Sequence, residues 1–402
     1  MRSPIPSPPV RTTDQGILRL PALHPTWLSS MSRNQLPGAS TVALMNETVG
    51  IGGAETVILQ LAQELVGRGR RVVCVLPRKD DWLTAELEAC GIPIRRFTIR
   101  GRMDLECVQE ITEALRRDGV EAVHSHEFAM AVHGTAVAHR LGCPHVITMH
   151  GNQTVLDRLR RRVALRWAFR HSRAAVAVSV STRDHMAERL GLSAEAIRVV
   201  RNGIPVRAGN RESTRRSLGL SPDHLAIFGA GSLVERKGFH VLVEALGMVE
   251  RRGSVPAEWR LFIAGEGSYR PEIEAAIARE GLGDRVTLLG YRLDIPDLQA
   301  AADLFAMPSL WEGLPLAVLE GMFAGNPLVA TRTSGIPEAV RDGVEGLLVT
   351  PGDPEELASA LERLLSDADL RARLGAGARA RATSEFTIQR MADEYEGLYG
   401  WA

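Results

Sequence analysis

The chain has 402 residues, of which 45% are hydrophobic and 24% charged, and 48 basic side chains balance 48 acidic ones. A length of this order suggests about two domains of ~100–200 residues, each large enough to bury its own core. The absence of net charge argues against a nucleic-acid-binding protein, and charges interrupt every apolar run before it reaches the ~18 residues of a membrane-spanning helix.

The neutral total hides two halves of opposite charge. Residues 1–205 hold 27 Lys/Arg and 19 Asp/Glu, whereas residues 206–402 hold 21 and 29. Only two lysines occur, Lys79 and Lys237, so arginine supplies nearly all of the positive charge. The four cysteines lie in the first half without a Cys-x-x-Cys pair, which predicts reduced thiols in a cytoplasmic protein.

Residues 1–39 are rich in Pro and Ser and lack hydrophobic periodicity, so we interpret them as a disordered extension, or as the product of an upstream start codon, and exclude them from the fold. From Thr41 onward, short apolar runs alternate with amphipathic stretches. Continuous apolar runs are typical of strands in a parallel sheet that helices cover on both faces. Residues 40–205 are therefore predicted to form a doubly wound α/β domain. Its expected strands are 41–46, 72–76, 94–98, 122–124, 145–149, 174–178 and 197–200.

The same rhythm returns after a Gly/Pro-containing linker at 202–205. Residues 206–386 are predicted to form a second parallel-sheet domain, which gives an α/β fold with two Rossmann-like domains facing each other across a cleft. Residues 387–402 are predicted to form a helix that packs across the domain boundary. The expected strands of the second domain are 226–230, 260–264, 286–289, 304–307, 328–331 and 346–349.

The first predicted strand leads into a glycine-rich turn, Gly50 to Gly53, and then into a helix. Glycines at such a turn let the backbone approach an anion, and the helix N-terminus favours negative charge. A dinucleotide-binding fingerprint would need a third glycine where Glu55 stands. On this motif alone, an ordinary tight turn is an equal alternative.

A cationic pair, Arg236 and Lys237, follows the first strand of the second domain in the sequence Glu-Arg-Lys-Gly. Such a pair can neutralise a diphosphate, Arg through its planar fork and Lys as a point charge. On these residues alone, a solvated surface pair is the preferred interpretation.

Two carboxylates, Glu312 and Glu320, lie just after an apolar strand and therefore at a carboxyl end of the predicted sheet. Glu312 falls in a Gly/Pro loop, whereas Glu320 lies in a predicted helix among apolar residues. A carboxylate can accept hydrogen bonds from two neighbouring hydroxyls of a sugar or ribose, and a buried carboxylate needs a partner. The alternative is a helix-capping acid and an incidental surface Glu.

Six motifs follow one another from about residue 41 to the C-terminus: Gly-Gly-Ala-Glu at 52–55, Met-His-Gly at 149–151, Asn-Gly-Ile at 202–204, Glu-Arg-Lys-Gly at 235–238, Gly-Glu-Gly at 265–267, and the pair Glu312 and Glu320. Taken together, they resemble the retaining family 4 glycosyltransferases of GT-B fold. The resemblance implies transfer of a hexose-type sugar from a nucleotide diphosphate donor to a glycan or lipid-linked acceptor, with retention at the anomeric carbon and without a metal or other cofactor. It further suggests a role in cell-envelope or exopolysaccharide biosynthesis.

The resemblance also implies a role for each matching residue. His150 and Glu312 are the implied catalytic residues, the histidine near the reacting centre and the carboxylate orienting the donor sugar. Arg236 and Lys237 are implied to bind the diphosphate, and Glu320 the ribose hydroxyls. The remaining implied donor-binding residues are Gly52, Gly53, Gly265, Tyr291, Gly313, Leu314 and Pro315.

Six histidines fall between positions 124 and 150. We expect His124 and His126 to end one strand at the cleft and His150 to end another, with the others in helices or at the surface. His126 and Glu127 are candidates for contacts with the acceptor. A zinc site is the less favoured alternative, because no cysteine or carboxylate completes a ligand set at the usual spacing.

Residues 157–173 hold seven arginines around Leu159, Val163 and Trp167, which recur at helical spacing. A basic amphipathic helix can lie on an anionic membrane surface. Equally, such a helix can turn this apolar stripe into the domain core. The first interpretation predicts peripheral attachment to the inner face of a membrane and suits a lipid-linked acceptor.

Two functions from other classes remain as alternatives. A non-hydrolysing sugar-nucleotide epimerase shares the two-domain architecture, and a non-catalytic subunit would only bind a sugar nucleotide. The spacing of Glu312 and Glu320 together with Arg-Lys-Gly favours transfer over epimerisation. The presence of His150 argues against an inactive relative.

Overall fold

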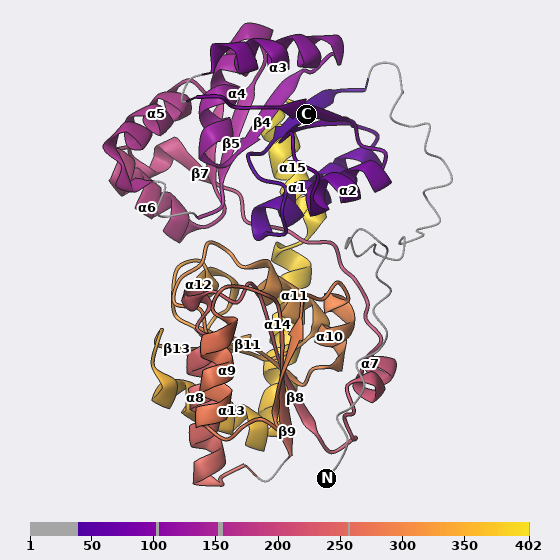
Figure 1. The fold of residues 1–402 in the computed structure, drawn as a ribbon, viewed down its shortest axis with the longest axis vertical. Helices are drawn as coiled ribbons and strands as arrows, with labels where there is room; N and C mark the ends of the chain where they lie inside the picture. The colour runs from indigo at the N-terminus through magenta and orange to yellow at the C-terminus, as the bar shows by residue number, and fades with distance from the viewer. Residues whose placement is uncertain (1–38, 102–103, 152–155, 256–257, 402) are drawn as a thin grey trace.

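Two parallel sheets, each packed between helices, make up the computed structural model (Figure 1). The structure describes residues 39–101, 104–151, 156–255 and 258–401. The predicted N-terminal extension, residues 1–39, lies outside this part of the chain except for its last residue. Within the same ranges, no helix combines the length and the apolar character needed to cross a membrane.

The N-terminal domain contains a seven-stranded sheet, counted over the described ranges, in the order β3-β2-β1-β4-β5-β6-β7. All residues of β1, β4 and β5 are buried, because helices cover both faces of the sheet. Leu44 in β1 pairs with Cys74 on one side and with His124 on the other. The strands are β1 Thr41–Met45, β2 Arg71–Pro77, β3 Ile94–Phe97, β4 Ala122–His126, β5 His145–Met149, β6 Ala174–Ala177 and β7 Ile197–Val199.

The C-terminal domain contains a six-stranded sheet, again among the described residues, in the order β10-β9-β8-β11-β12-β13. The prediction of two doubly wound parallel-sheet domains is therefore confirmed, and each expected strand is found within two residues of its predicted ends. The strands are β8 Leu225–Ala230, β9 Trp259–Ala264, β10 Val286–Gly290, β11 Leu304–Met307, β12 Leu328–Thr331 and β13 Gly346–Val349.

Helices connect the strands, and polar side chains begin many of them. Asp104 accepts a hydrogen bond from the backbone N–H of Cys107 at 2.9 Å, and Asp353 accepts two in the same way. The α-helices are α1 Gly53–Gly67, α2 Trp82–Ala89, α3 Leu105–Arg117, α4 Glu127–Leu141, α5 Leu159–Arg170, α6 Val180–Leu190, α7 Arg211–Ser217, α8 Phe239–Arg252, α9 Arg270–Arg279, α10 Ile295–Ala301, α11 Leu316–Ala324, α12 Ile336–Ala339, α13 Pro354–Ser366, α14 Ala368–Glu385 and α15 Ile388–Tyr399.

The C-terminal helix α15 returns to the N-terminal domain and lies beside α1 (Figure 1). The chain crosses between the domains next to Thr387, which forms an isolated parallel bridge with Ile204. Tyr395 and Tyr399 are then buried in the hydrophobic core that surrounds β1 and β2. On the rim, Arg68 forms an ion pair with Glu396 at 2.7 Å.

Candidate functional site

The loops that follow β5 and β11 meet between the two domains. A Cβ atom on Gly313 would lie 2.4 Å from the carbonyl oxygen of His150, and one on Gly151 would lie 3.0 Å from Cα of Gly313. Only residues without a side chain allow this approach. Nearby, the carbonyl oxygen of Leu314 accepts a hydrogen bond from the side-chain amide of Asn202 at 3.0 Å. Three of the sequence motifs are thus joined into one region.

A buried ion pair lies on the C-terminal side of this region, where β8 and β11 are neighbours in the sheet. Lys237 Nζ is 2.5 Å from Glu312 Oε1, and the same oxygen accepts a hydrogen bond from the Ser309 hydroxyl at 2.8 Å. The side chains of Lys237 and Glu312 are only 11% and 7% exposed, so the solvated-pair interpretation is wrong for Lys237. The Arg236 guanidinium is 38% exposed, lies 3.5 Å from Glu312 Oε2 and stacks 4.7 Å from the Trp311 ring.

Two turns that contain glycine, at Gly231 and Gly265, lie next to the Lys237 side chain. A Cβ atom on Gly265, whose φ is 148°, would lie 1.9 Å from the carbonyl oxygen of Gly231, so only glycine fits there. A Cβ atom on Gly231 would in turn lie 3.3 Å from Lys237 Cε. The predicted donor-binding residue Gly265 therefore packs against Gly231, and Gly231 in turn packs against the Lys237 side chain.

The glycine turn of the N-terminal domain begins helix α1. Gly52 is the N-cap and Gly53 the first helical residue, with open space where its Cβ would be. The buried Glu55 folds back against this turn, and its carboxylate accepts a hydrogen bond from the Thr48 hydroxyl. Between described residues, no hydrogen bond or ion pair connects this turn to Lys237.

The ends of β4 and β5 bring His126, Glu127 and His150 together. His126 Nδ1 lies 2.9 Å from His150 Nε2, and the two rings are stacked. The backbone N–H of His150 donates to Glu127 Oε1 at 3.1 Å. Burial lowers the pKa of His150 to about 4 and that of His126 well below its usual value. Both imidazoles are therefore neutral at pH 7, so each carries one donor and one acceptor nitrogen.

Glu127 has an unusual backbone conformation and a carboxyl group with a raised pKa. It is a non-glycine residue with a φ of 63°, a conformation that costs energy and is found at functional sites. Burial raises the pKa of its carboxyl group to about 7, an effect to which the nearby charges of Glu47 and Glu55 add. A carboxyl group that titrates near neutrality can take up or release a proton at this edge of the sheet.

Behind these residues lies a buried hydrogen-bond network that the sequence did not reveal. His124 Nδ1 is 2.7 Å from the Tyr399 hydroxyl, and His124 Nε2 is 2.8 Å from the Thr148 hydroxyl. Thr148 also contacts the Tyr395 hydroxyl at 3.0 Å. The His124 ring lies 4.2 Å from the His126 ring, so helix α15 is connected to the histidine pair. Two tyrosines at helical spacing near the C-terminus were the only signal.

One histidine departs from the prediction that the remaining ones lie in helices or at the surface. His145 is buried at the start of β5, where its ring lies 2.9 Å from the Ser125 hydroxyl and 3.2 Å from that of Thr135. Strand residues covered on both faces can be polar when every ring nitrogen finds a partner.

Glu320 and Tyr291 are two further predicted donor-binding residues, and both have a raised pKa. Burial raises the pKa of Glu320 to about 7, opposed by the positive charge of Arg207, and burial raises the pKa of Tyr291 to about 12, reinforced by Glu86. In the part of the chain that the structure describes, no hydrogen bond or ion pair joins Glu320 to Lys237. The structure thus brings together the residues implied to bind the diphosphate and the sugar, whereas the implied ribose carboxylate has no hydrogen-bond or ion-pair partner among the described residues. Pro315 lies between Glu312 and Glu320 in the sequence and is the N-cap residue of α11, the helix that contains Glu320.

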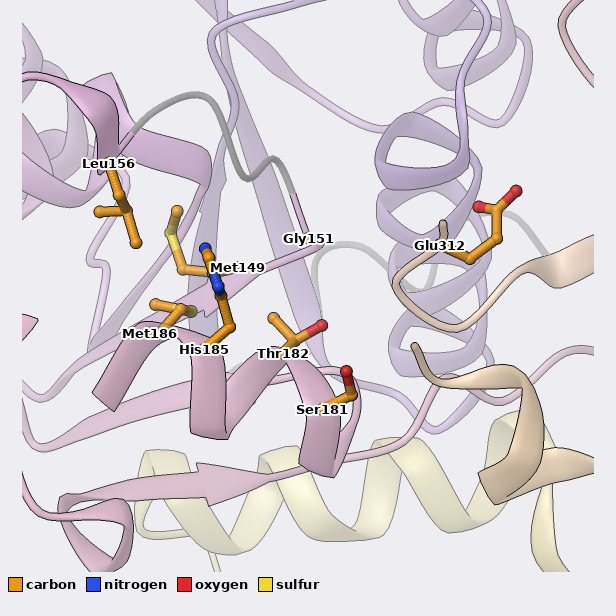
Figure 2. A pocket seen from close by; sticks show the side chains of 8 residues that line it. All are labelled: Met149, Gly151, Leu156, Ser181, Thr182, His185, Met186 and Glu312. Atoms are coloured by element: carbon orange, nitrogen blue, oxygen red, sulfur yellow. The ribbon is translucent and has the colours of Figure 1, made fainter. Parts of the chain in front are cut away.

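A small pocket opens beside Glu312 (Figure 2). Seven of its lining residues come from the N-terminal domain, and Glu312 lines it from the loop of the other domain with its carboxylate turned away from them. Met149, Leu156 and Met186 give it an apolar floor, while Thr182 adds a hydroxyl group. The complete lining is Met149, Gly151, Leu156, Ser181, Thr182, His185, Met186 and Glu312.

An Asp-x-Asp sequence, a pattern often associated with metal-bound diphosphates, occurs at Asp367 and Asp369. Asp367 caps helix α14 by accepting a hydrogen bond from the backbone N–H of Leu370 at 2.8 Å. This segment is therefore explained by helix capping.

Comparisons with known proteins cover both domains. The family described as "Glycosyltransferase Family 4" matches residues 51–207, and that described as "Glycosyl transferases group 1" matches residues 224–367. The alpha-D-kanosaminyltransferase of Streptomyces kanamyceticus is 31% identical over 307 residues, which are 71% of this chain and 78% of that protein. The UDP-Gal:alpha-D-GlcNAc-diphosphoundecaprenol alpha-1,3-galactosyltransferase of Escherichia coli is 24% identical over 79% of this chain and 85% of that one.

The structural match agrees with the sequence matches. The crystal structure of HepE from Anabaena in complex with UDP-glucose superposes with a TM-score of 0.78 and 26% identity, over 90% of this chain and 99% of that one. The two parallel-sheet domains thus form a GT-B fold. The chain belongs to the family 4, or group 1, glycosyltransferases, which act on sugar-nucleotide donors.

Proposed function

We propose that this glycosyltransferase moves a hexose-type sugar from a nucleotide diphosphate donor to a hydroxyl group of a glycan or lipid-linked acceptor, with retention of the anomeric configuration and without a metal. The observation that carries the proposal is the buried contact between Lys237 and Glu312, with Arg236 beside it. It supports a site in which a cation for the diphosphate and a carboxylate for the sugar hydroxyls lie within one hydrogen bond of each other.

The cations match the charge that develops in the reaction. Breaking the glycosidic bond leaves negative charge on the nucleotide diphosphate, and cations held in place beforehand stabilise that charge more in the transition state than in the ground state. Lys237 is held by Glu312. Arg236 keeps a more exposed guanidinium, whose planar fork suits phosphate oxygens.

The histidine pair, His126 and His150, suits contacts with hydroxyl groups on the side of the sugar opposite the cations. His150 enters as a neutral imidazole whose Nε2 faces His126, which leaves Nδ1 for a substrate hydroxyl. Glu312, the carboxylate implied to face the sugar, is engaged by Lys237 and Ser309. We therefore favour attack from the face that the diphosphate leaves, within an ion pair, over a covalent intermediate on a carboxylate.

The names of relatives guide the choice of substrates. The name of the Escherichia coli relative contains a diphosphoundecaprenol-linked acceptor, which supports a lipid-linked acceptor and a pathway of cell-envelope or exopolysaccharide biosynthesis. HepE was solved with UDP-glucose, so a uridine nucleotide is the first donor to test. Among the described residues the four cysteines are free thiols, which supports the cytoplasm as the place of action.

The test is incubation of the full chain with UDP-, GDP- and ADP-sugars without an acceptor. We expect slow transfer to water with one nucleotide, seen as release of the nucleoside diphosphate and free sugar. Proton NMR of the freshly released sugar should show the anomeric configuration of the donor. Release of the opposite anomer would contradict retention.

The same incubation separates the alternatives. An altered sugar that is still attached to the nucleotide would indicate the epimerase. Donor binding in a thermal-shift measurement without any turnover, also after addition of lipid-linked acceptors, would indicate a non-catalytic binding subunit.

A further inference from the structure

Helix α5 turns part of its apolar stripe toward solvent. Its buried residues are Leu165, Ala168 and Phe169, which belong to the core beneath the helix. Leu159 and Val163, one turn apart, are 71% and 62% exposed. Of the two interpretations that the sequence left open for this stripe, burial in the core is therefore wrong for Leu159 and Val163, whereas Trp167 is partly buried and packs against the core.

Positive charge surrounds the exposed stripe. Helix α5 contains five arginines and no acidic residue, and Arg158 precedes it. Asp157, the nearest acid in the sequence, is paired with Arg189 at 3.0 Å. Ion pairs to described carboxylates are absent for Arg158, Arg161, Arg162, Arg166 and Arg170.

Among the helices that the structure describes, only α5 combines large exposed apolar side chains with neighbouring arginines. Arg158, Leu159, Arg160 and Val163 line one open hollow at the surface, which with Arg170 we call the α5 surface. Figure 1 shows α5 at the outer edge of the N-terminal domain, far from α15. Leu105 at the start of α3 is comparably exposed, at 60%, but is flanked by Asp104 and Glu106.

We propose that the α5 surface docks on an anionic lipid bilayer. Apolar side chains that project between arginines are the pattern by which a helix lies in a membrane interface, with the apolar groups at the acyl boundary and the cations at the headgroups. Electrostatic attraction to anionic lipid and burial of Leu159 and Val163 act together, and each alone is weak.

The position of α5 next to the pocket gives docking on the bilayer a functional role. Leu156, three residues before α5 begins, lines the pocket that contains Glu312 (Figure 2). Docking therefore holds the acceptor side of the site close to the lipid surface, where a lipid-linked acceptor resides. Docking itself requires no substrate, so it is tested apart from the transferase activity.

The experiment is sedimentation of the full chain with vesicles of phosphatidylcholine alone or with phosphatidylglycerol added, at low and high salt. We expect binding only to the anionic vesicles, with at least a tenfold loss in the double variant Leu159→Ser/Val163→Ser and in Arg158→Glu/Arg170→Glu. The matched control is Leu105→Ser, which removes a comparably exposed leucine flanked by Asp104 and Glu106 and should bind like the wild type.

Three results would overturn the proposal: equal partitioning onto neutral and anionic vesicles, no binding to either, or full binding by the double serine variant. Sedimentation velocity without lipid tests whether a second copy of the chain, rather than a bilayer, occupies the α5 surface. A dimer that the double serine variant dissolves would assign the α5 surface to a second copy of the chain instead. Because all substituted residues are exposed, unchanged thermal unfolding of each variant confirms that the fold is intact.

Discussion

The two sides of the site hold their groups by different physical means. On the C-terminal side, Lys237 and Glu312 form a buried ion pair with Arg236 alongside. On the N-terminal side, His126 and His150 are neutral rings joined by a hydrogen bond. The first arrangement suits a substrate group that carries charge throughout, such as a diphosphate. The second suits neutral hydroxyl groups and the movement of a proton.

The difference also shows in how each side is built. The charged side comes from two short loops after neighbouring strands, β8 and β11. The neutral side depends on β4, β5 and helix α15, and α15 lies more than 200 positions along the chain from the two strands that it contacts. Damage to the charged side should therefore affect donor binding first, and damage to the neutral side should affect stability and proton transfer.

The largest expected effect is that of Lys237→Ala. It removes the cation from Glu312 and from the implied diphosphate position, so we expect kcat/KM to fall by about 10²–10³-fold, the usual effect of deleting one preorganised charge-stabilising group. Initial rates, measured with the nucleotide sugar that the incubation with UDP-, GDP- and ADP-sugars identifies as the donor, test this expectation. The control is Lys79→Ala, the other lysine, which is 68% exposed and paired with Asp81. Equal rates in the two variants would remove Lys237 from the donor site.

The next effect concerns Glu127 and pH. Burial raises the pKa of its carboxyl group from 4.5 to about 7, so the buried group favours its protonated form. That favourable state is fully present below pH 4.5 and is lost as pH rises through 7. We expect Glu127→Gln to gain up to about 3 kcal/mol in unfolding free energy relative to the wild type between pH 4.5 and 8.

Urea unfolding at both pH values measures this change. The Glu106→Gln variant serves as the control, because replacing an exposed carboxylate that pairs with the exposed Arg100 should change the unfolding free energy by less than about 1 kcal/mol at either pH. A constant difference between Glu127→Gln and the wild type at the two pH values would mean that folding does not raise the pKa of this carboxyl group.

A smaller effect is expected for Tyr399→Phe. The substitution removes the hydroxyl that lies 2.7 Å from His124 Nδ1 and leaves a fully buried ring nitrogen without a partner. An unfolding free energy lower by about 1–3 kcal/mol is expected. Tyr269→Phe, at a half-buried position of the other domain where no described residue hydrogen-bonds to the hydroxyl, should change the unfolding free energy by less than about 0.5 kcal/mol. If the two variants lose the same stability, the network does not hold α15 in place.

The smallest effect is that of Gly53→Ala. No atom lies within 4 Å of the added Cβ, and position 53 is helical, so stability should rise by about 0.4–1 kcal/mol. The donor, in contrast, is expected to need the open space, so KM for the donor should rise. Thermal unfolding and initial rates on the same preparation check both parts. An unchanged KM would place the donor away from this turn.

The sequence predicted the fold and the charged side well, and the neutral side less well. Apolar runs of four to seven residues separated by turns define strands locally, so β11 was predicted without error. The Lys237–Glu312 contact follows from two loops at one sheet edge, although the sequence alone favoured solvent exposure for the pair. The contact of His124 with Tyr399 depends on the path of α15 across the other domain, which no local pattern encodes. The orientation of the apolar stripe on α5 likewise depends on tertiary packing.

The most direct test of the account is a crystal structure of the full chain with UDP. We predict that the diphosphate lies against Arg236 and Lys237 at the carboxyl ends of β8 and β11, with Glu312 close to its outer phosphate. A nucleotide bound elsewhere, or a diphosphate that contacts neither cation, would contradict the assignment of this site to the donor.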